Sequence, residues 1–588
     1  MGVVRYKYTI LGGIIMSVRA SDKMVEVLNK WGVDNIYGLP GDSVDTTIDA
    51  LYRVQNKIKF THVLHEEVAA LAASAHAKLT GKLGVCLSIG GPGAIHLLNG
   101  LYDAKMDHAP VLAILGQVQS KLLNTDYFQE VDTHVLFDDV AVYNKIIMDP
   151  QSLPRIMDEA IRTAIAKKGV AVLTIPDDIP DHMIKDNFTP NNDIEKESYQ
   201  IDDTKIKAIL DMMKIHSNPI VLAGVGIKDA KKETKEFIEK YKLPVILTMP
   251  AKGLVDDNHP YNLGQLGKLG TKPAFEMMQK ADLVIMIGTD YPYAPYLNKK
   301  VDAIQIDINA DRLGKRRHVN IAVQADAKEV LTRLNELGEP VAERHFLDTA
   351  VSKMGQWRSW MHDVYTKKHD GVLPSLMFHN ISEIAPSDTI WSIDVGTSTA
   401  FGARFLTAKA SQDYTISAWL GTMGCALPGA IAAKNAFPDR PVYAIAGDGA
   451  TSMVMQDFAT AVKYNLPMLY IVLNNKLLAF IEYEQQSAGQ QNYGISLPEI
   501  DFAKVAEACG GIGERITTDA EFKEAITKYR HPDKPVLLDV AVTDEAPLPG
   551  KIMMDEAQGY AKFGLGHVID KKSLPALPPM KEILRSFL

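Results

Sequence analysis

Two polar turns in the last third of the chain carry residue types that bind a hard metal cation. An apolar stretch of β-forming residues, Val442 to Ala446, ends at Gly447-Asp448-Gly449, and a second stretch, 468–473, ends at Asn474-Asn475. Short apolar runs bounded by turn residues are typical of buried strands. The pattern therefore predicts that Asp448 and Asn475 lie at the carboxyl ends of two parallel strands, where open α/β sheets bind ligands.

The donor atoms at these turns suit magnesium and a diphosphate. Asp448 offers a carboxylate, Asn475 an amide oxygen, and the backbone carbonyl near Leu477 a third oxygen. Mg²⁺ takes such ligands and completes its shell with water and substrate phosphates. Gly447 and Gly449 allow close backbone approach, and the following helix N-terminus favours negative charge. The alternative is an ordinary strand-to-helix turn that carries an aspartate; the Asn-Asn pair at this distance favours the metal–diphosphate interpretation.

A third candidate acid, Glu66, lies far from these turns in the sequence. It stands between a predicted strand at 60–64 and an alanine-rich helix at 68–79. An apolar setting of this kind should raise the pKa of a carboxyl group by desolvation, as acid–base catalysis requires. A first-turn acid favoured by the helix dipole would give the same pattern. The spacing alone leaves both interpretations open.

The composition indicates an ordinary globular α/β protein and narrows its partners. The 588 residues carry a net charge of −9 with a pI near 6.0, which argues against nucleic acid as a partner. No apolar run reaches the roughly 18 residues that span a bilayer. The three cysteines, Cys86, Cys425 and Cys509, are far apart, which fits a reducing cytoplasm without a disulfide framework.

Helical and strand patterns alternate along the chain, and this predicts three doubly wound parallel-sheet domains of the α/β class. The outer two are similar in design, which suggests duplication. Residues 1–16 are interpreted as a disordered extension, with a possible start at Met16. The predicted domains are 17–182, 204–340 and 370–547, followed by a tail at 548–588.

The tail ends in a predicted amphipathic helix. Its apolar residues recur at helical spacing and form one stripe: Met580, Ile583, Leu584, Phe587 and Leu588. Such a stripe can dock on the protein's own surface or make reversible contact with a membrane. Both alternatives stay open at the level of the sequence.

Several motifs together resemble the thiamine diphosphate (ThDP) enzymes, and within them the FAD-containing pyruvate oxidase family. The resemblance extends from about Ser21 to Pro547. The motifs are Gly447-Asp448-Gly449 with Asn474-Asn475, His65-Glu66, Gly90-Gly91-Pro92-Gly93 with His96, Phe128-Gln129-Glu130, 420–424 and 480–484. The chain is most similar to bacterial pyruvate:quinone oxidoreductases and their phosphate-using relatives. The resemblance implies a pyrimidine-binding domain, a central FAD-binding domain and a diphosphate-binding domain.

The resemblance assigns roles to the ThDP residues. Asp448, Asn475 and the Leu477 carbonyl would hold Mg²⁺ on the diphosphate. Met423 would support ThDP in a bent conformation, and the Gly421 carbonyl would accept from its amino group. Glu66 of a partner subunit would hydrogen-bond the aminopyrimidine. The bent conformation would bring the basic amino group of the cofactor close to the ring carbon that it deprotonates, and such proximity favours proton transfer.

The resemblance also implies that pyruvate is decarboxylated and that two electrons pass to FAD. Phe128, Gln129, Phe480 and Glu484 would lie around the reacting group between ThDP and the flavin. The FAD contacts would come from the middle domain, in these places: Gly224, Lys252-Gly253, Gly267 to Thr271, Thr289-Asp290, Asp307 and Asp326.

The fate of the acetyl group divides the family. Phosphate-using members carry Gly where this chain has Asp42 and Lys-Asp where it has Glu482-Tyr483, so negative charge increases near the expected phosphate path. With the tail stripe, this favours quinone as oxidant and acetate as product. The alternative is acetyl phosphate formed with O₂ and hydrogen peroxide.

Two other functions stay open from the sequence. One is an acetolactate synthase-like carboligase, and the other is a non-catalytic nucleotide-binding scaffold. If the resemblance holds, sharing of ThDP between subunits requires at least a dimer, and the family commonly forms homotetramers. The expected location is the cytoplasm, with peripheral contact at the inner face of the cell membrane as an option.

Overall fold

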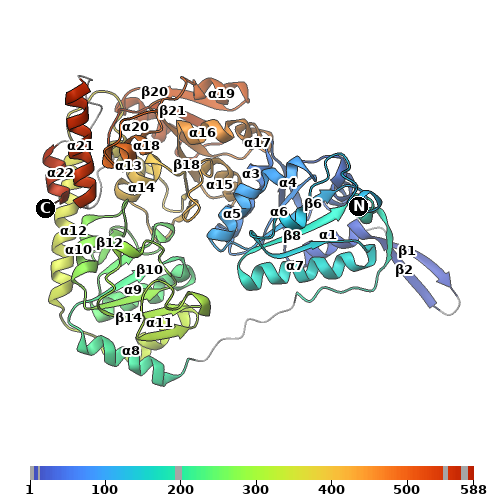
Figure 1. Ribbon diagram of the computed structural model, residues 1–588, viewed down its shortest axis with the longest axis horizontal. Coiled ribbons are helices and arrows are strands. Elements are labelled where there is room, and N and C mark those ends of the chain that lie inside the picture. The colour runs from blue at the N-terminus through green and yellow to red at the C-terminus, as the bar shows by residue number, and fades with distance from the viewer. Residues whose placement is uncertain (1–4, 11–12, 193–200, 547–553, 571–579, 588) are drawn as a thin grey trace.

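Three sheets of six parallel strands, with helices packed against them, form the body of the protein (Figure 1). The structure is a computed structural model that describes residues 5–10, 13–192, 201–546, 554–570 and 580–587. The predicted fold class, three doubly wound parallel α/β domains, is confirmed.

The first domain has the strand order β4-β3-β5-β6-β8-β7. Its helix α3 (Glu66–Thr80) is almost entirely buried, because alanine dominates every face. Gly100 on α5 permits close contact with α3, since a Cβ there would lie 2.5 Å from the Cβ of Ala70. The remaining elements are β3 (Asn35–Gly38), β4 (Lys59–His62), β5 (Gly84–Ser88), β6 (Val111–Gln117), β7 (Ala141–Ile146), β8 (Val170–Pro176), α1 (Ala20–Lys30), α2 (Asp45–Arg53), α4 (Pro92–His96), α5 (Leu98–Met106), α6 (Thr133–Leu136) and α7 (Leu153–Lys167).

The middle domain has the order β12-β11-β10-β13-β14-β15. Numbered along the domain, this is 3-2-1-4-5-6, the order of dinucleotide-binding folds, whose ligands bind where the strand order reverses. Its elements are β10 (Pro219–Ala223), β11 (Val245–Leu247), β12 (Asn262–Gln265), β13 (Leu283–Ile287), β14 (Asp302–Asp307), β15 (Ile321–Gln324), α8 (Asp203–Ile215), α9 (Lys231–Tyr241), α10 (Lys272–Lys280) and α11 (Ala327–Leu337).

The third domain has the order β17-β16-β18-β19-β21-β20. Numbered within each domain, the first and third sheets both read 2-1-3-4-6-5, which agrees with the similar design expected for the outer domains. The elements are β16 (Ile390–Ile393), β17 (Asp413–Thr415), β18 (Val442–Gly447), β19 (Leu469–Asn474), β20 (Ile512–Ile516), β21 (Val536–Ala541), α13 (Pro374–Ile384), α14 (Thr397–Phe405), α15 (Ala426–Ala436), α16 (Asp448–Val454), α17 (Phe458–Lys463), α18 (Ala479–Ser487), α19 (Phe502–Ala508) and α20 (Asp519–Lys528).

The N-terminal segment differs from the disordered extension predicted for residues 1–16. Strands β1 (Arg5–Ile10) and β2 (Gly13–Arg19) form an antiparallel hairpin, and β2 also pairs with β9 (Met183–Lys185). The alternation of Ile14, Met16 and Val18 with other residues supports the second strand. Residues 1–4 and 11–12 lie outside the described part.

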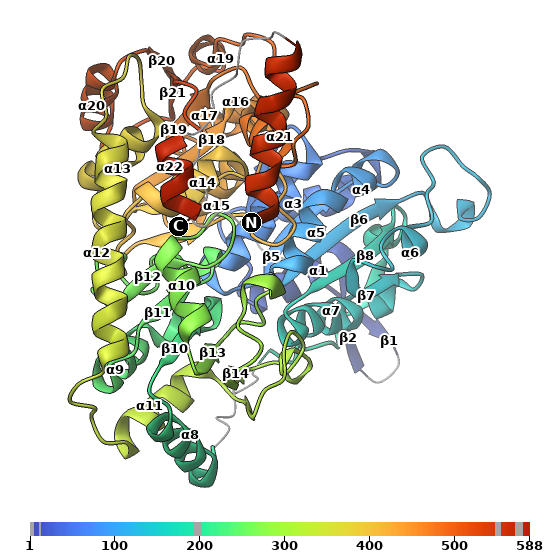
Figure 2. The ribbon, with the colours of Figure 1, turned by 60° about the vertical axis from the view of Figure 1, so that its left-hand side comes forward.

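The C-terminal helix α22 (Met580–Phe587) lies beside the long helix α12 (His345–Tyr365), whereas α21 (Met554–Asp570) packs against α18 (Figures 1 and 2). The indole of Trp360 on α12 donates to Glu582, and the Arg585 guanidinium lies 5.0 Å from the Trp360 ring centroid. Lys272 donates to the Arg585 carbonyl at 2.8 Å. In this structure α22 therefore docks on the protein's own surface. None of the helices in the described ranges is long and apolar enough to cross a membrane.

Candidate active site

Three adjacent strands of the third sheet end at polar side chains. Asp394 follows β16, Asp448 follows β18 and Asn475 follows β19, and these strands are neighbours in the sheet. Because the strands are parallel, their carboxyl ends meet at one edge. The predicted placement of Asp448 and Asn475 at two strand ends agrees with the fold.

The Asp448 carboxylate is buried and held by backbone amides. Its Oδ1 accepts from the Gly449 N–H at 2.8 Å and its Oδ2 from the Lys476 N–H at 2.6 Å. Lys476 has φ 61°, a left-handed conformation that folds its turn back toward Asp448. Burial raises the pKa of Asp448, and the backbone hydrogen bonds oppose that shift. A bound cation would compensate the buried charge, which fits a magnesium site.

Asn475 and Leu477 belong to the same turn. The Asn475 Oδ1 accepts from the Leu477 N–H at 3.2 Å, which orients the amide oxygen and leaves the second lone pair of that oxygen for another partner. The turn also brings its backbone to Asp448 through Lys476. The oxygen-rich donor set of Asp448, Asn475 and the Leu477 carbonyl suits a hard cation.

The space beside this turn is open enough for a ligand. A Cβ added to Gly447 or Gly421 would meet no atom within 4 Å. The Met423 Cε lies 3.3 Å from the Cβ position of Gly449, so the thioether side chain reaches the Gly-Asp-Gly turn. Gly421 has φ 69°, a conformation that glycine adopts without strain. These features fit the predicted diphosphate and the predicted role of Met423 as a support for the cofactor.

Asp394 is a functional candidate that the sequence motifs do not include. It is fully buried, and its two oxygens accept from the N–H groups of Val395, Gly424 and Ala426 at 2.8–2.9 Å. Burial raises the pKa of Asp394 to about 6. The carboxylate fixes the loop that carries Met423. Only the tertiary fold reveals this role, because Gly424 lies 30 positions away.

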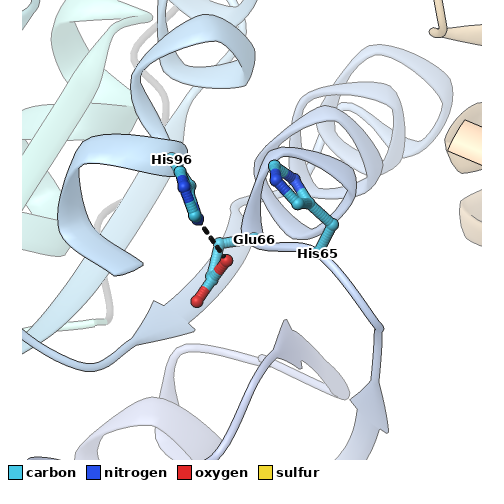
Figure 3. A group of neighbouring side chains, drawn as sticks. All are labelled: His65, Glu66 and His96. Carbon is cyan, nitrogen blue, oxygen red and sulfur yellow. Dashed lines mark hydrogen bonds and ion pairs between the residues drawn. The ribbon is translucent and has the colours of Figure 1, made fainter. Parts of the chain in front are cut away.

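Glu66 stands at the start of α3 with its carboxyl buried (Figure 3). The Nδ1 of His96 lies 2.9 Å from Glu66 Oε2, and Gly93 leaves room for Oε1, since a Cβ there would lie 3.0 Å away. The motif analysis included His96 but gave it no role. The geometry gives Glu66 a titratable hydrogen-bond partner within its own domain.

His65 completes a cluster with Glu66 and His96. The two imidazoles stack with centroids 4.6 Å apart, and the three groups' ligand atoms lie within 4.8 Å of one another. Such a set could also bind a transition metal. His65 Nδ1 already accepts from the Glu67 N–H at 3.2 Å and caps α3, so this nitrogen has a structural role.

Gln129 belongs to the same end of the first domain, and Phe128 precedes it. A Cβ on Gly91 would lie 2.7 Å from the Gln129 carbonyl, so Gln129 packs against the glycine turn that also borders Glu66. Phe128 is 77% exposed, unusual for a large aromatic side chain. Its ring is therefore available to a surface beyond this chain.

Hydrogen bonds join the Glu66 end of α3 to the third domain of the same chain. The Leu64 N–H donates to Asp457 at 2.8 Å, and Asn99 donates to both Glu67 at 2.5 Å and Thr422 at 2.8 Å. Thr422 precedes Met423. Within the described residues, however, the Glu66 side chain pairs with His96 and forms no hydrogen bond or ion pair with the metal-site residues.

The middle domain touches helix α18, which carries Phe480 and Glu484. The Lys268 ammonium lies 3.4 Å from Glu484 Oε1 and 5.8 Å from the Phe480 ring centroid. Lys268 is part of the loop 267–271 that was predicted to contact FAD. The structure thus brings this loop next to two of the predicted catalytic residues.

Several predicted FAD contacts have structural partners. Lys252 pairs with Asp257 at 2.6 Å, and Thr271 and Asp326 cap helices α10 and α11. Gly224 allows close packing of strand ends, since its Cβ would lie 2.5 Å from the Gly288 carbonyl. Asp290 forms ion pairs with Arg312 at 3.3 Å and Arg316 at 3.6 Å. The Asp307 side chain accepts from the Asn309 N–H, and the Thr289 hydroxyl accepts from the Tyr291 N–H. Gly253 has φ 82°.

Other buried groups near this loop have no hydrogen-bond partner and fit a polar ligand. Both amide atoms of Gln265, at the carboxyl end of β12, are buried and unpaired. The Tyr291 hydroxyl is also unpaired and lies 3.0 Å from the Cβ position of Gly267. Buried polar groups almost always have partners. These orphaned atoms suit the hydrogen-bonding groups of a flavin nucleotide, and sequence reasoning did not identify them.

Glu482 faces the interior rather than the predicted substrate path. It is 4% exposed, accepts from Asn492 at 2.8 Å, and its Oε2 has no partner. Burial, together with the nearby Asp544, raises the pKa of Glu482 to about 7. At neutral pH about half of the negative charge expected from Glu482 is therefore lost to protonation.

Family models match three separate segments between residues 18 and 540. They describe thiamine pyrophosphate enzymes: the N-terminal TPP binding domain at 18–136, the central domain at 206–334 and the C-terminal TPP binding domain at 394–540. These matches fall on the three parallel sheets.

Relatives of known name cover nearly the full chain. A putative thiamine pyrophosphate-containing protein, YdaP, of Bacillus subtilis is 44% identical over 96% of this chain and 99% of its own. A pyruvate oxidase of Lactiplantibacillus plantarum is 36% identical over 93% and 92%. The acetolactate synthase isozyme 2 large subunit of Escherichia coli is 30% identical over 89% and 95%.

Replacing Asp394 with asparagine should loosen the Met423 loop. An asparagine offers one acceptor oxygen where the carboxylate has two, so the N–H groups now bonded to it cannot all remain satisfied. We expect a loss of about 1–3 kcal/mol in the free energy of unfolding. The affinity for thiamine diphosphate, measured through the quenching of intrinsic protein fluorescence, should fall about tenfold or more. Asp388→Asn, an exposed change before β16, is the control; equal behaviour of the two variants would refute the role of Asp394.

Glu482 should make stability fall with rising pH. The unfolded chain ionises this carboxyl near its ordinary pKa of 4.5, whereas the folded protein keeps the proton until about pH 7. Between these values folding retains a proton, so stability decreases as pH rises. We expect Glu482→Gln to reduce this slope and to melt above the wild type at pH 8. Melting temperatures from pH 4.5 to 8, with Glu484→Gln as the control on the same helix, test this; an unchanged slope contradicts it.

Proposed function

Since the chain belongs to the thiamine pyrophosphate enzymes, in their pyruvate oxidase family, we propose that it oxidatively decarboxylates pyruvate. The proposed cofactors are thiamine diphosphate, Mg²⁺ and FAD. The observation that carries the proposal is the contact of Lys268 with Phe480 and Glu484. It joins the candidate flavin loop to the helix that follows the metal turn, as electron transfer between two cofactors requires.

In this proposal Asp448 and Asn475 hold Mg²⁺ on the diphosphate, with the Leu477 carbonyl as a third ligand. Gly447 and Gly449 leave space for the diphosphate, and the Met423 side chain would support the bent cofactor. When bound, thiamine diphosphate supplies the nucleophilic carbon and the electron sink for decarboxylation, and FAD accepts two electrons. The protein's role is to orient these groups and exclude water.

Glu66 is the proposed proton carrier. Its buried carboxyl would share a proton with the ring nitrogen N1′ of the aminopyrimidine, a contact that favours the imino form of the ring. His96 holds the opposite side of the carboxyl through Oε2. Phe128 and Gln129, with Phe480 and Glu484, would enclose the substrate.

We propose that Glu66 serves the metal site of a partner subunit. Two features support this arrangement: the aromatic side chain of Phe128 is exposed, and within the described residues Glu66 forms no hydrogen bond with the metal turn. A C₂ pair would complete two such sites at once. The proposed assembly is a homotetramer built from these dimers.

We propose quinone as the electron acceptor and acetate as the product, in the cytoplasm at the inner face of the membrane. Asp42 and the apolar stripe of the tail support this choice. Acetyl phosphate formed with phosphate and O₂ is the second candidate. It is favoured by the Lys268 ammonium near Glu484 and by the inward position of Glu482, which leaves less negative charge at the site than the sequence suggested.

Rapid anaerobic mixing with pyruvate tests the reaction. We expect pyruvate to bleach the flavin absorbance of the loaded enzyme, and Glu66→Gln to slow this step by about 100-fold or more, since general acid–base catalysis contributes effects of that size. Glu67→Gln, one position on, is the control and should react close to wild type.

The same experiment separates the alternatives. Acetolactate formation without flavin bleaching would identify a carboligase, and no conversion with any cofactor would identify a scaffold. Reoxidation of the bleached enzyme by a quinone analogue, or by O₂ with phosphate, identifies the acceptor and product. Wild-type bleaching by Glu66→Gln would refute the proposed role of Glu66.

The tail gives a separate prediction. We expect α22 to detach from α12 and insert its apolar stripe into lipid, so deletion of residues 577–588 should abolish cosedimentation with anionic liposomes. Because α22 covers Trp360, deletion should also shift the tryptophan emission to longer wavelength. A double change on the polar face, Lys581→Gln with Arg585→Gln, separates electrostatic from apolar binding. Equal liposome binding by the full and truncated chains would remove membrane contact from the proposal.

A further inference from the structure

Arg404, near the end of α14, has unused hydrogen-bond donors in the interior of the protein. Its Nε and Nη1 nitrogens are buried and have no partner. Nη2 donates to the Lys268 carbonyl at 3.2 Å. Five N–H donors on one guanidinium normally find acceptors, and a buried donor left unpaired is costly. The vacant donors therefore indicate that an acceptor joins them in the working protein.

The acceptor should carry negative charge. Across the described ranges, no carboxylate forms an ion pair with Arg404; the ionisable group that acts on its charge is the Tyr560 phenol, and burial raises the pKa of Tyr560 to about 12. Burial lowers the pKa of Arg404 to about 9, so its guanidinium is still charged at neutral pH. A largely buried cation without a counter-ion favours binding of an anion.

A second cationic residue, Lys268, meets Arg404 through its backbone. Arg404 donates to the Lys268 carbonyl, and the half-exposed ammonium of Lys268 contacts Glu484 and the Phe480 ring. Arg404 comes from the third domain and Lys268 from the middle domain. The two residues therefore meet at the junction of α14, α18 and the loop 267–271.

We propose that Arg404 and Lys268 form a binding subsite for an anionic oxygen group, supplied either by the bound flavin nucleotide or by free inorganic phosphate. The planar guanidinium matches a phosphate or a polarised carbonyl through its paired N–H groups, and the lysine adds a point charge. The subsite deepens the proposed function, because its occupant is either the cofactor or the second substrate. The inference rests on that function only for the identity of the occupant.

The test compares ligand binding by the full-length wild type and by Arg404→Gln. FAD is titrated into flavin-free protein by fluorescence, and inorganic phosphate is titrated into the FAD-loaded protein by calorimetry at constant ionic strength. Arg404→Lys retains the charge but not the paired donors. Arg333→Gln is the matched control, because Arg333 is on α11 and pairs with Asp203 and Glu336.

If the flavin is the source, Arg404→Gln should weaken FAD binding by about tenfold or more while phosphate binding is unchanged or absent in both proteins. If phosphate is the source, FAD binding should stay within twofold and phosphate binding should be lost. Arg404→Lys should fall between wild type and Arg404→Gln. In ligand-free protein Arg404→Gln should melt at or above the wild type, because an unpaired buried charge is removed.

Changes below twofold for both ligands, or equal changes in Arg333→Gln, would overturn the subsite and indicate that water serves these donors. If the wild type does not bind FAD, the proposed function is refuted. In that case phosphate is titrated into the flavin-free protein, and this titration alone decides whether the subsite exists. If Arg404→Gln does not fold, the same two titrations on Arg404→Lys decide the result by the same criteria.

Discussion

The packing of α3 against α15 is the constraint on which the site depends. Both helices are rich in alanine, and Ala69, Ala72, Ala430 and Ala433 are fully buried in one core shared by the first and third domains. Small side chains let the helix axes come close, and a close-packed interface resists displacement. Glu66 begins α3, and the Met423 loop leads into α15. The interface therefore fixes the starting points of both catalytic segments.

Three buried carboxylates hold the segments around the site in place through hydrogen bonds to the backbone. Asp394 binds the backbone before α15, Asp448 binds the turn after β19, and Asp457 binds the Leu64 N–H just before α3. Each accepts from backbone amides, which stabilise negative charge in the interior without a cation. At Asp448 a magnesium ion would join those amides. The same interaction thus serves loop positioning in two places and proposed cofactor binding in the third.

Polar side chains connect the middle domain to the third domain. Lys252 donates to the Ala403 carbonyl, and Lys268 reaches Glu484. Orphaned donors and acceptors gather here, at Gln265, Tyr291 and Arg404. Their concentration at one junction indicates that the domain interface is completed by a ligand, which agrees with a flavin between the middle and third domains. The tail helices close the outer side of this junction through α12 and α18.

The sequence by itself determined the fold class, the strand ends that carry Asp448 and Asn475, and the family, since apolar runs and turn motifs are local patterns. The sequence alone could not show whether Gly224 is a glycine because a ligand approaches it or because strand ends pack against it. Likewise, it could not show whether Thr271 binds a ligand or caps a helix, because the same residue type serves both purposes. The pairing of β2 with β9, more than 160 residues later, has no local signal in the sequence. Tertiary structure alone revealed the backbone hydrogen bonds of Asp394, the contact of His96 with Glu66, the unpaired donors of Arg404 and the inward position of Glu482. These features depend on partners distant in the chain and on burial, and neither is encoded in local spacing.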